Sequence, residues 1–161
     1  MPSSKEYSVQ EREQALDDFE MFLFYMDDVL ELFIEQAEEK GIDLDYSLES
    51  LDQLENYALL VDEKPLSDFH GHSSQYLGEV VRKCFGGKWI LSLDMKENSL
   101  YYGKPVIYGH SKFDVQYAPY SIMATFLRRR LTGLLKRSVL GQINPPPPLD
   151  LSHLPTEDPI E

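Results

Sequence analysis

The chain has 161 residues, an apolar fraction of 42% and a net charge of −13, which together predict one domain with a single core. The negative charge argues against nucleic-acid binding, because carboxylates repel phosphates. No apolar run approaches the roughly 18 residues that span a bilayer. The first ten residues lack a signal-peptide pattern, and the single cysteine fits a reducing compartment. We therefore expect a soluble, cytoplasmic protein without a membrane contact.

The charge is divided unevenly along the chain. Residues 1–63 hold 19 of the 28 acidic residues but only three of the 15 basic ones, which gives this segment a net charge of −16, whereas residues 64–161 carry +3. An acidic segment favours a protein partner with a basic surface, or serves only to keep the protein in solution. The charge narrows the class of partner but points to no reaction.

The first predicted element is a long amphipathic helix from Ser8 to Lys40–Gly41. Ser8 and Glu11 form the S-x-x-E pattern of a capping box, and glycine commonly ends a helix. Apolar residues recur every three or four positions and predict one buried stripe. The stripe comprises Leu16, Phe19, Phe22, Leu23, Met26, Val29, Leu30, Phe33, Ile34 and Ala37.

The other side of this helix is rich in carboxylates. Like charges four residues apart, such as Asp27/Glu31, oppose the helix by a few tenths of a kcal/mol (~0.2–0.5) per pair, which burial of the stripe easily offsets. We identify six of these carboxylates as the candidate partner-binding residues. They are Asp27, Asp28, Glu31, Glu35, Glu38 and Glu39.

Two shorter helices are expected next. Ser47 and Ser50 are candidate N-caps of the first, which ends before Pro65 because the residue before proline disfavours helical geometry. Residues 66–73 are interpreted as a polar connection that contains His70 and His72. The second helix begins near Tyr76, and the glycines at positions 86 and 87 end it.

The hydrophobic period then changes to two. Residues 88–94, 99–102 and 105–110 predict an antiparallel meander, which residues 113–117 would extend. Pro119 begins a last amphipathic helix that runs to Gly141. A proline-rich tail, residues 142–161, is expected to be extended. The fold class is therefore α+β, with one domain in residues 1–141.

Candidate chemical groups are few. His70 and His72 allow a metal-dependent enzyme or a metal sensor as an alternative function, although no paired zinc motif accompanies them. Cys84 is predicted to be a buried structural thiol, and Glu79 to form a structural ion pair, with Arg82 or a basic residue of the last helix as its partner. The basic run 128–130 is expected to dock against the acidic half of the same chain. No catalytic motif is present, so we expect neither an enzyme nor a cofactor.

Two short motifs carry a resemblance to known proteins: Tyr76-Leu77-Gly78-Glu79 and Gly86-Gly87-Lys88-Trp89. They resemble small uncharacterised bacterial α+β domains that have a Y-x-G-E helix, a glycine break and a tryptophan-bearing strand. The likeness covers about residues 45–137 in pattern. It implies an α+β fold without enzymatic activity, close helix packing at Gly78, and structural roles for Glu79 and Trp89.

In type rather than in motif, a small acidic α+β protein also resembles the immunity proteins of bacterial toxin systems. Such a protein binds its toxin rapidly when the charges are complementary. The leading hypothesis is a non-enzymatic protein-binding module, most concretely an immunity protein that masks a basic toxin surface. A regulatory or structural subunit with a solvated acidic face is a further alternative, and the oligomeric state is left open.

Overall fold

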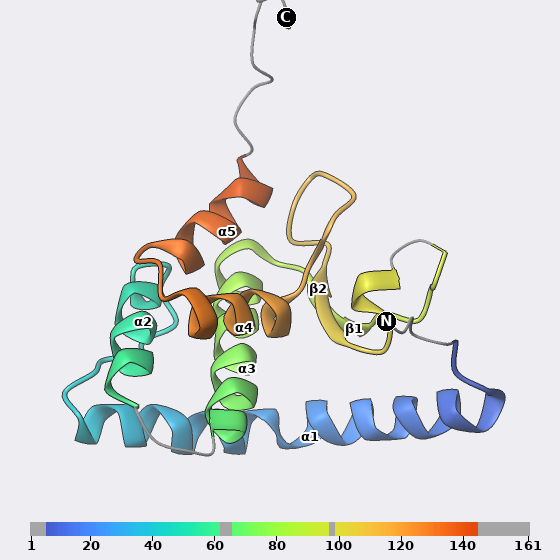
Figure 1. Cartoon of the computed structure of the whole chain (residues 1–161), viewed down its shortest axis with the longest axis horizontal. Helices are drawn as coiled ribbons and strands as arrows, with labels where there is room; N and C mark the ends of the chain where they lie inside the picture. Colours follow the sequence, from blue (N-terminus) through green and yellow to red (C-terminus); the bar gives the residue numbers. More distant parts are fainter. Residues whose placement is uncertain (1–5, 62–65, 97–98, 145–161) are drawn as a thin grey trace, which may run out of the picture.

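The computed structural model describes residues 6–61, 66–96 and 99–144 (Figure 1). Within them the chain forms five α-helices, a 3-10 helix and a three-stranded antiparallel sheet, so the predicted α+β class is confirmed. The helices are α1 (Val9–Glu39), α2 (Ser50–Leu60), α3 (Leu66–Phe85), α4 (Pro119–Arg129) and α5 (Leu134–Ile143). The other elements are β1 (Lys88–Leu91), η1 (Ser99–Tyr101), β2 (Pro105–Tyr108) and β3 (Gln116–Tyr117).

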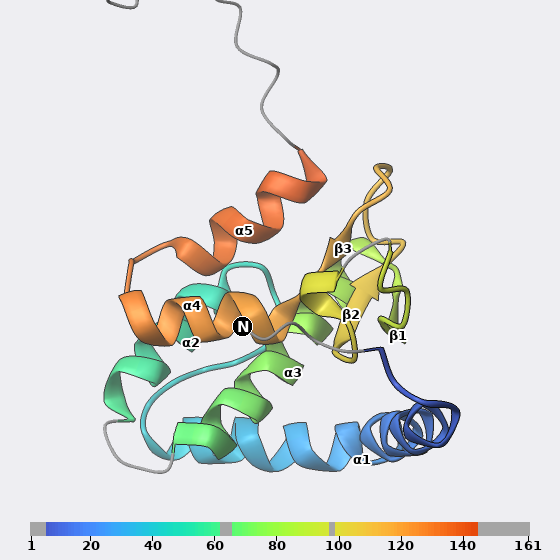
Figure 2. The same cartoon turned by 45° about the vertical axis from the view of Figure 1, so that its right-hand side comes forward.

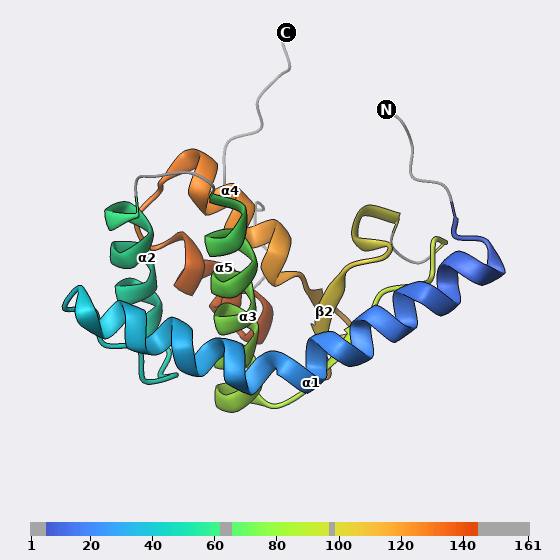
Figure 3. The same cartoon turned by 90° about the horizontal axis from the view of Figure 1, so that it is seen from below.

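The long helix α1 forms the base of the molecule. Helices α2 and α3 stand on its C-terminal half, and the sheet lies beside its N-terminal half (Figure 1). Helix α4 crosses α3, and α5 lies on the side away from α1 (Figure 2). Viewed from below, α1 crosses the whole face of the molecule with no other element in front of it (Figure 3). One side of α1 therefore packs on the protein while the other faces solvent.

Both ends of α1 follow the sequence prediction. The Ser8 side chain accepts a hydrogen bond from the Glu11 backbone N–H at 3.1 Å, and Glu11 Oε1 accepts one from the Ser8 backbone N–H at 2.9 Å, which completes the capping box. At the other end, Gly41 adopts a φ of +79°, and the Ile42 N–H donates to the Ala37 carbonyl at 2.9 Å. Glycine is suited to this left-handed position because it has no Cβ.

The core is built around the inner side of α1. Phe33 is fully enclosed, and its ring lies 5.3 Å from that of Tyr57 and 5.7 Å from that of Phe69, measured between centroids. The predicted stripe is buried or half-buried except at Leu16 and Leu23, which are exposed. The prediction was wrong at these two positions because only the small sheet and its connections lie beside this part of α1, so the covered strip is narrower there.

The sheet joins this core through a row of buried residues. Trp89 on β1 pairs with Ile107 on β2, which pairs with Tyr117 on β3. Gly78 on α3 lies directly against Trp89, so closely that a Cβ at this position would overlap the indole ring. Close packing at Gly78 is thus confirmed, although its partner is the tryptophan together with Pro119 of α4.

Three predicted elements differ from the structure. Residues 66–73 belong to α3 rather than to a connection, and residues 99–101 form a 3-10 turn rather than a strand. The last helix is divided into α4 and α5, because Arg130 and Gly133 adopt left-handed φ values of 55° and 86°. Helix α5 ends at Ile143, two residues into the predicted tail, and residues 145–161 lie outside the described part of the chain.

Candidate protein-binding surface

All six predicted carboxylates are exposed on α1. The helix turns 100° per residue, which directs most of them to the side opposite the buried residues Met26, Leu30 and Phe33 and places Asp27 at the edge of that side. This is the side that no other element covers in Figure 3. We term the surface formed by Asp27, Asp28, Glu31, Glu35, Glu38 and Glu39 the acidic face.

The borders of the acidic face are marked by two of its members. Asp27 lines a cavity of about 380 Å³ together with Arg82, whose pKa is raised first by its hydrogen bond to Glu79 and further by the charges of Glu79 and Asp27. Glu39 lies near Tyr57, whose pKa is raised by burial and then by the charge of Glu39. The other four carboxylates project between these borders.

Among the described residues no carboxylate of the acidic face forms an ion pair, although the charge of Arg82 interacts with Asp27 at the border of the face. In the described part of the chain the ion pairs are Glu79–Arg82 and Asp52–Lys136, and neither involves the acidic face. Neighbouring carboxylates repel each other at Asp27/Glu31 and Glu31/Glu35, at a cost of about 0.2–0.5 kcal/mol per pair. The helix carries this repulsion because its opposite side is anchored in the core.

Exposed apolar side chains lie beside these carboxylates, and the sequence interpretation missed them. Met21, Phe24, Tyr25 and Leu32 all lie outside the buried stripe, and Phe24 is 74% exposed. The Phe24 and Tyr25 rings contact each other edge to face at 4.9 Å between centroids. The sequence did hold a signal for them, since Met21, Tyr25 and Leu32 are spaced by four and seven residues, which is a second helical period.

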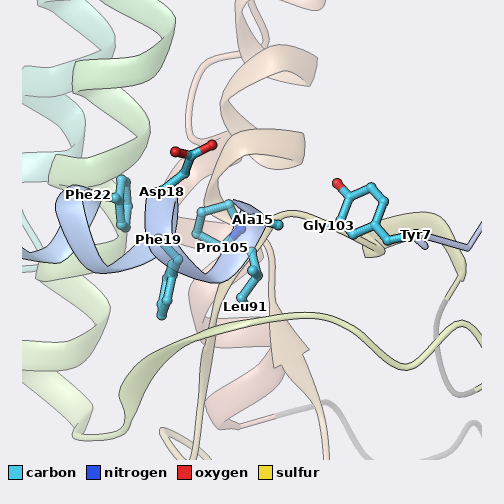
Figure 4. Close-up of a pocket in the computed structure, with 8 residues that line it drawn as sticks. All are labelled: Tyr7, Ala15, Asp18, Phe19, Phe22, Leu91, Gly103 and Pro105. Carbon is cyan, nitrogen blue, oxygen red and sulfur yellow. The ribbon is translucent and has the colours of Figure 1, made fainter. Parts of the chain in front are cut away.

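A cavity of about 280 Å³ opens between the N-terminal half of α1 and the sheet (Figure 4). Its walls are mainly apolar, and Asp18 contributes the carboxylate among the residues that line it. The lining residues are Tyr7, Ala15, Asp18, Phe19, Phe22, Leu91, Gly103 and Pro105. The cavity therefore combines apolar walls with one carboxylate.

Glu79 forms the predicted ion pair with Arg82. Its two oxygens accept hydrogen bonds from Arg82 Nε at 2.8 Å and Nη2 at 2.9 Å, and Oε2 also accepts one from Trp89 Nε1 at 2.8 Å. Burial alone would raise the pKa of Glu79, but the hydrogen bonds from Arg82 and Trp89 and the charges of Arg82 and Lys83 outweigh it and lower the pKa. Because the donors come from Arg82 on α3 and Trp89 on β1, the Glu79 carboxylate links α3 to β1 and has a structural role.

The two histidines point in different directions, because residues two apart on a helix lie about 200° apart. His70 is hydrogen-bonded through Nε2 to the Tyr120 carbonyl at 2.8 Å, while the His72 ring contacts Phe33. Among the described residues no group of three or more histidine, cysteine, aspartate or glutamate side chains is placed to hold a metal. This geometry gives the metal-dependent alternative no support.

The Cys84 thiol is exposed, so the prediction of a buried thiol was wrong. Cys84 follows the buried stripe of α3 in sequence, but it lies in the last turn of the helix, past the covered residues Val80 and Val81. Its sulfur donates to the Tyr46 carbonyl at 3.5 Å. Partial desolvation raises the pKa of the thiol, which disfavours the reactive thiolate.

The basic residues of α4 and α5 contact the acidic half of the chain only in part. Lys136 Nζ on α5 pairs with Asp52 on α2 at 3.2 Å and so contacts the acidic half of the chain. Arg128, Arg129 and Arg130 are exposed at the end of α4, and in the described ranges none of them forms an ion pair. The arginine prediction was wrong because the left-handed Arg130 ends α4 and α5 continues in a new direction.

Comparison of the chain with protein-family models, with curated proteins and with solved structures finds no match. No helix in the described ranges is both long and apolar enough to cross a membrane. The fold and the surface thus define an α+β protein with an uncovered acidic helix.

Proposed function

We propose that this chain is a non-enzymatic protein-binding module that holds a basic surface of another protein against the acidic face of α1. The observation that carries the proposal is the exposure of all six carboxylates on a helix that no other described element covers in Figure 3, without an ion pair in the described part of the chain. A partner with lysines or arginines would remove the repulsion between these carboxylates.

Such a surface acts chiefly on the rate of association. Complementary charges steer two proteins together and raise the association rate constant well above the 10⁵–10⁶ M⁻¹s⁻¹ or so of uncharged surfaces, and salt weakens the effect. Apolar contacts then slow dissociation. The exposed apolar residues beside the acidic face could supply those contacts.

In its most specific form, the proposal is that the partner is a bacterial toxin and that the chain is its immunity protein, acting in the cytoplasm. The acidic character and the small α+β fold support this form. Rapid capture of a basic toxin surface is the task for which charge steering is suited. This form requires that co-expression of the chain abolishes the toxicity of the partner that is identified by binding.

The test compares two charge-reversal variants with equal net charge. The face variant carries Asp28→Lys, Glu31→Lys and Glu35→Lys. The control variant carries lysines at three exposed acidic residues off the acidic face: Glu6, Asp43 and Asp68. Wild-type, face-variant and control proteins are immobilised and exposed to lysate from the source cells, and bound proteins are quantified by mass spectrometry.

We expect the wild-type and control proteins to retain one protein with a basic surface that the face variant loses. Retention should weaken as the salt concentration rises. Equal retention of the same proteins by the face variant would contradict the proposal and favour a solvated acidic face. Circular dichroism checks that both variants keep the fold.

A further inference from the structure

Seven exposed residues of α1 follow an alternating spacing of three and four positions. They are Asp18, Met21, Tyr25, Asp28, Leu32, Glu35 and Glu39. This is the spacing of the a and d positions of a coiled coil, which places the seven side chains along one nearly straight line of the helix. The line spans about 32 Å at 1.5 Å per residue. We term it the outer seam.

We propose that the outer seam receives an amphipathic helix of a partner protein, with apolar and basic residues at the same spacing. The inference rests on the proposed function and adds the chemistry and the secondary structure of the partner. Single exposed apolar residues need no explanation, but a contiguous set does. Here Met21, Tyr25 and Leu32 lie on one line with carboxylates between and beyond them.

The pattern of the outer seam fixes what the partner helix presents. Met21, Tyr25 and Leu32 require apolar side chains opposite them. Removing each of these side chains from water stabilises the complex by about 1–3 kcal/mol. Asp28 and Glu35 require lysine or arginine, because an unpaired carboxylate in an interface is costly. A helix that is merely basic, or merely apolar, matches only half of the seam.

The cavity in Figure 4 lies at the N-terminal end of the outer seam. Asp18 belongs to both, since it is the first residue of the seam and also lines the cavity with Phe19 and Phe22. A lysine or arginine at the matching end of the partner helix can lay its aliphatic stem along these rings and its charge beside Asp18. The cavity thus anchors the end of the partner helix.

A dimer in which two outer seams face each other and the segment 145–161 both lack the required charge. A second copy of the chain would bring four carboxylates of its own seam against the four of the first, and like charges across an interface oppose association. The segment 145–161 of the same chain carries four acidic residues and no lysine or arginine. A basic helix from another protein is the occupant that fits.

The experiment uses two synthetic peptides of about 22 residues, the length of the outer seam. The patterned peptide has leucine and lysine at the three-four spacing that complements the seam. The permuted peptide has the same composition and charge, but its leucines and lysines are scattered around the helix. Binding of each labelled peptide to the whole protein is measured by fluorescence anisotropy at low and high salt.

Two further variants separate the apolar contribution from the charge. The seam variant carries Met21→Gln, Tyr25→Gln and Leu32→Gln, since glutamine keeps the helix propensity high. Its control carries glutamine at three exposed leucines elsewhere, Leu59, Leu60 and Leu140. Thermal unfolding confirms that both fold. The face variant tests the charge with the same peptides.

We expect the wild-type and control proteins to bind the patterned peptide about tenfold more tightly than the permuted one. The seam variant should lose this preference and keep only weak, salt-sensitive binding. Equal binding of both peptides, or an unchanged preference in the seam variant, would overturn the inference. A wild-type dimer that the seam variant abolishes would also overturn it, because a second copy would then be the occupant.

The outcome for the face variant distinguishes this inference from the proposed function. If the two peptides bind equally but the face variant binds both more weakly, the inference fails and the acidic face still attracts basic partners. If the face variant binds both peptides as the wild type does, the inference and the proposed function fail together.

Discussion

The carboxylates of this protein fall into two groups with opposite environments. Glu79 and Glu55 are buried, and both accept hydrogen bonds from donors in other parts of the fold or the same helix. The Glu55 oxygens accept from the backbone N–H groups of Gly133 at 2.9 Å and Leu135 at 3.0 Å, which places a negative charge at the N-terminus of α5. Among the described residues no hydrogen-bond donor of this kind faces the six carboxylates of the acidic face. Buried acids therefore hold elements of this protein together, whereas exposed acids are available to a partner.

The largest effect is expected at Glu79. Replacing it by alanine removes the acceptor for Trp89 Nε1 and for two nitrogens of Arg82, and leaves the indole N–H buried without a partner. Because Arg82 is 39% exposed and water can solvate it, we expect a loss of about 2–3 kcal/mol, less than for a fully buried pair. Urea unfolding measures the loss. A change below about 0.5 kcal/mol, the size of a surface substitution, would contradict the structural role.

Glu55 gives the next effect. Glu55→Ala leaves the N–H groups of Gly133 and Leu135 without their acceptor, and the expected loss is about 1–2 kcal/mol. The loss should be concentrated in α5, so amide hydrogen exchange there should accelerate more than in α1. Equal acceleration in both helices would show that Glu55 supports the whole fold rather than the start of α5.

Acid should weaken the link that Glu79 makes. Its pKa is lowered in the folded state from the ordinary value of 4.5, so ionised Glu79 stabilises the protein fully above that value. The stabilisation is lost as the pH falls through 4.5 toward the folded-state pKa. The difference in unfolding free energy between the wild type and Glu79→Gln should therefore shrink as the pH falls below 4.5. A difference that stays constant would contradict the assignment.

The smallest effect on stability is expected on the acidic face. Glu31 lies four residues from both Asp27 and Glu35, so Glu31→Gln relieves two repulsions and should stabilise the protein by a few tenths of a kcal/mol (~0.2–0.5) per pair. Destabilisation by Glu31→Gln would mean that Glu31 has a structural partner and does not belong with the exposed acids that are available to a partner protein.

Local signals in the sequence predicted much of the fold. The capping box at Ser8 and the glycine at position 41 located the ends of α1, because both act within one turn of helix. The ion pair between Glu79 and Arg82 was predicted for a similar reason, since residues three apart on a helix are neighbours. Such features are set by residues that are close together in the sequence.

The errors depend on contacts between distant elements. The apolar period at Leu16 and Leu23 predicted burial, but nothing in that period reveals how little of the molecule lies beside the start of α1. Cys84 and the arginines after Leu127 were misplaced for the same reason, because tertiary contacts decide where a covered face ends. The carboxylates of the acidic face could be located on one side of the helix, but only the fold reveals that none of them forms an ion pair among the described residues.

The ionic-strength dependence of association is the sharpest test of the claim that the acidic face attracts a basic partner. Stopped-flow measurements with the captured partner give the association rate constant of the wild-type, face-variant and control proteins over a range of salt concentrations. We predict that the rate for the wild-type and control proteins falls steeply as salt rises, and that the face variant associates about tenfold more slowly at low salt with little salt dependence. The same salt dependence for all three proteins would contradict the claim.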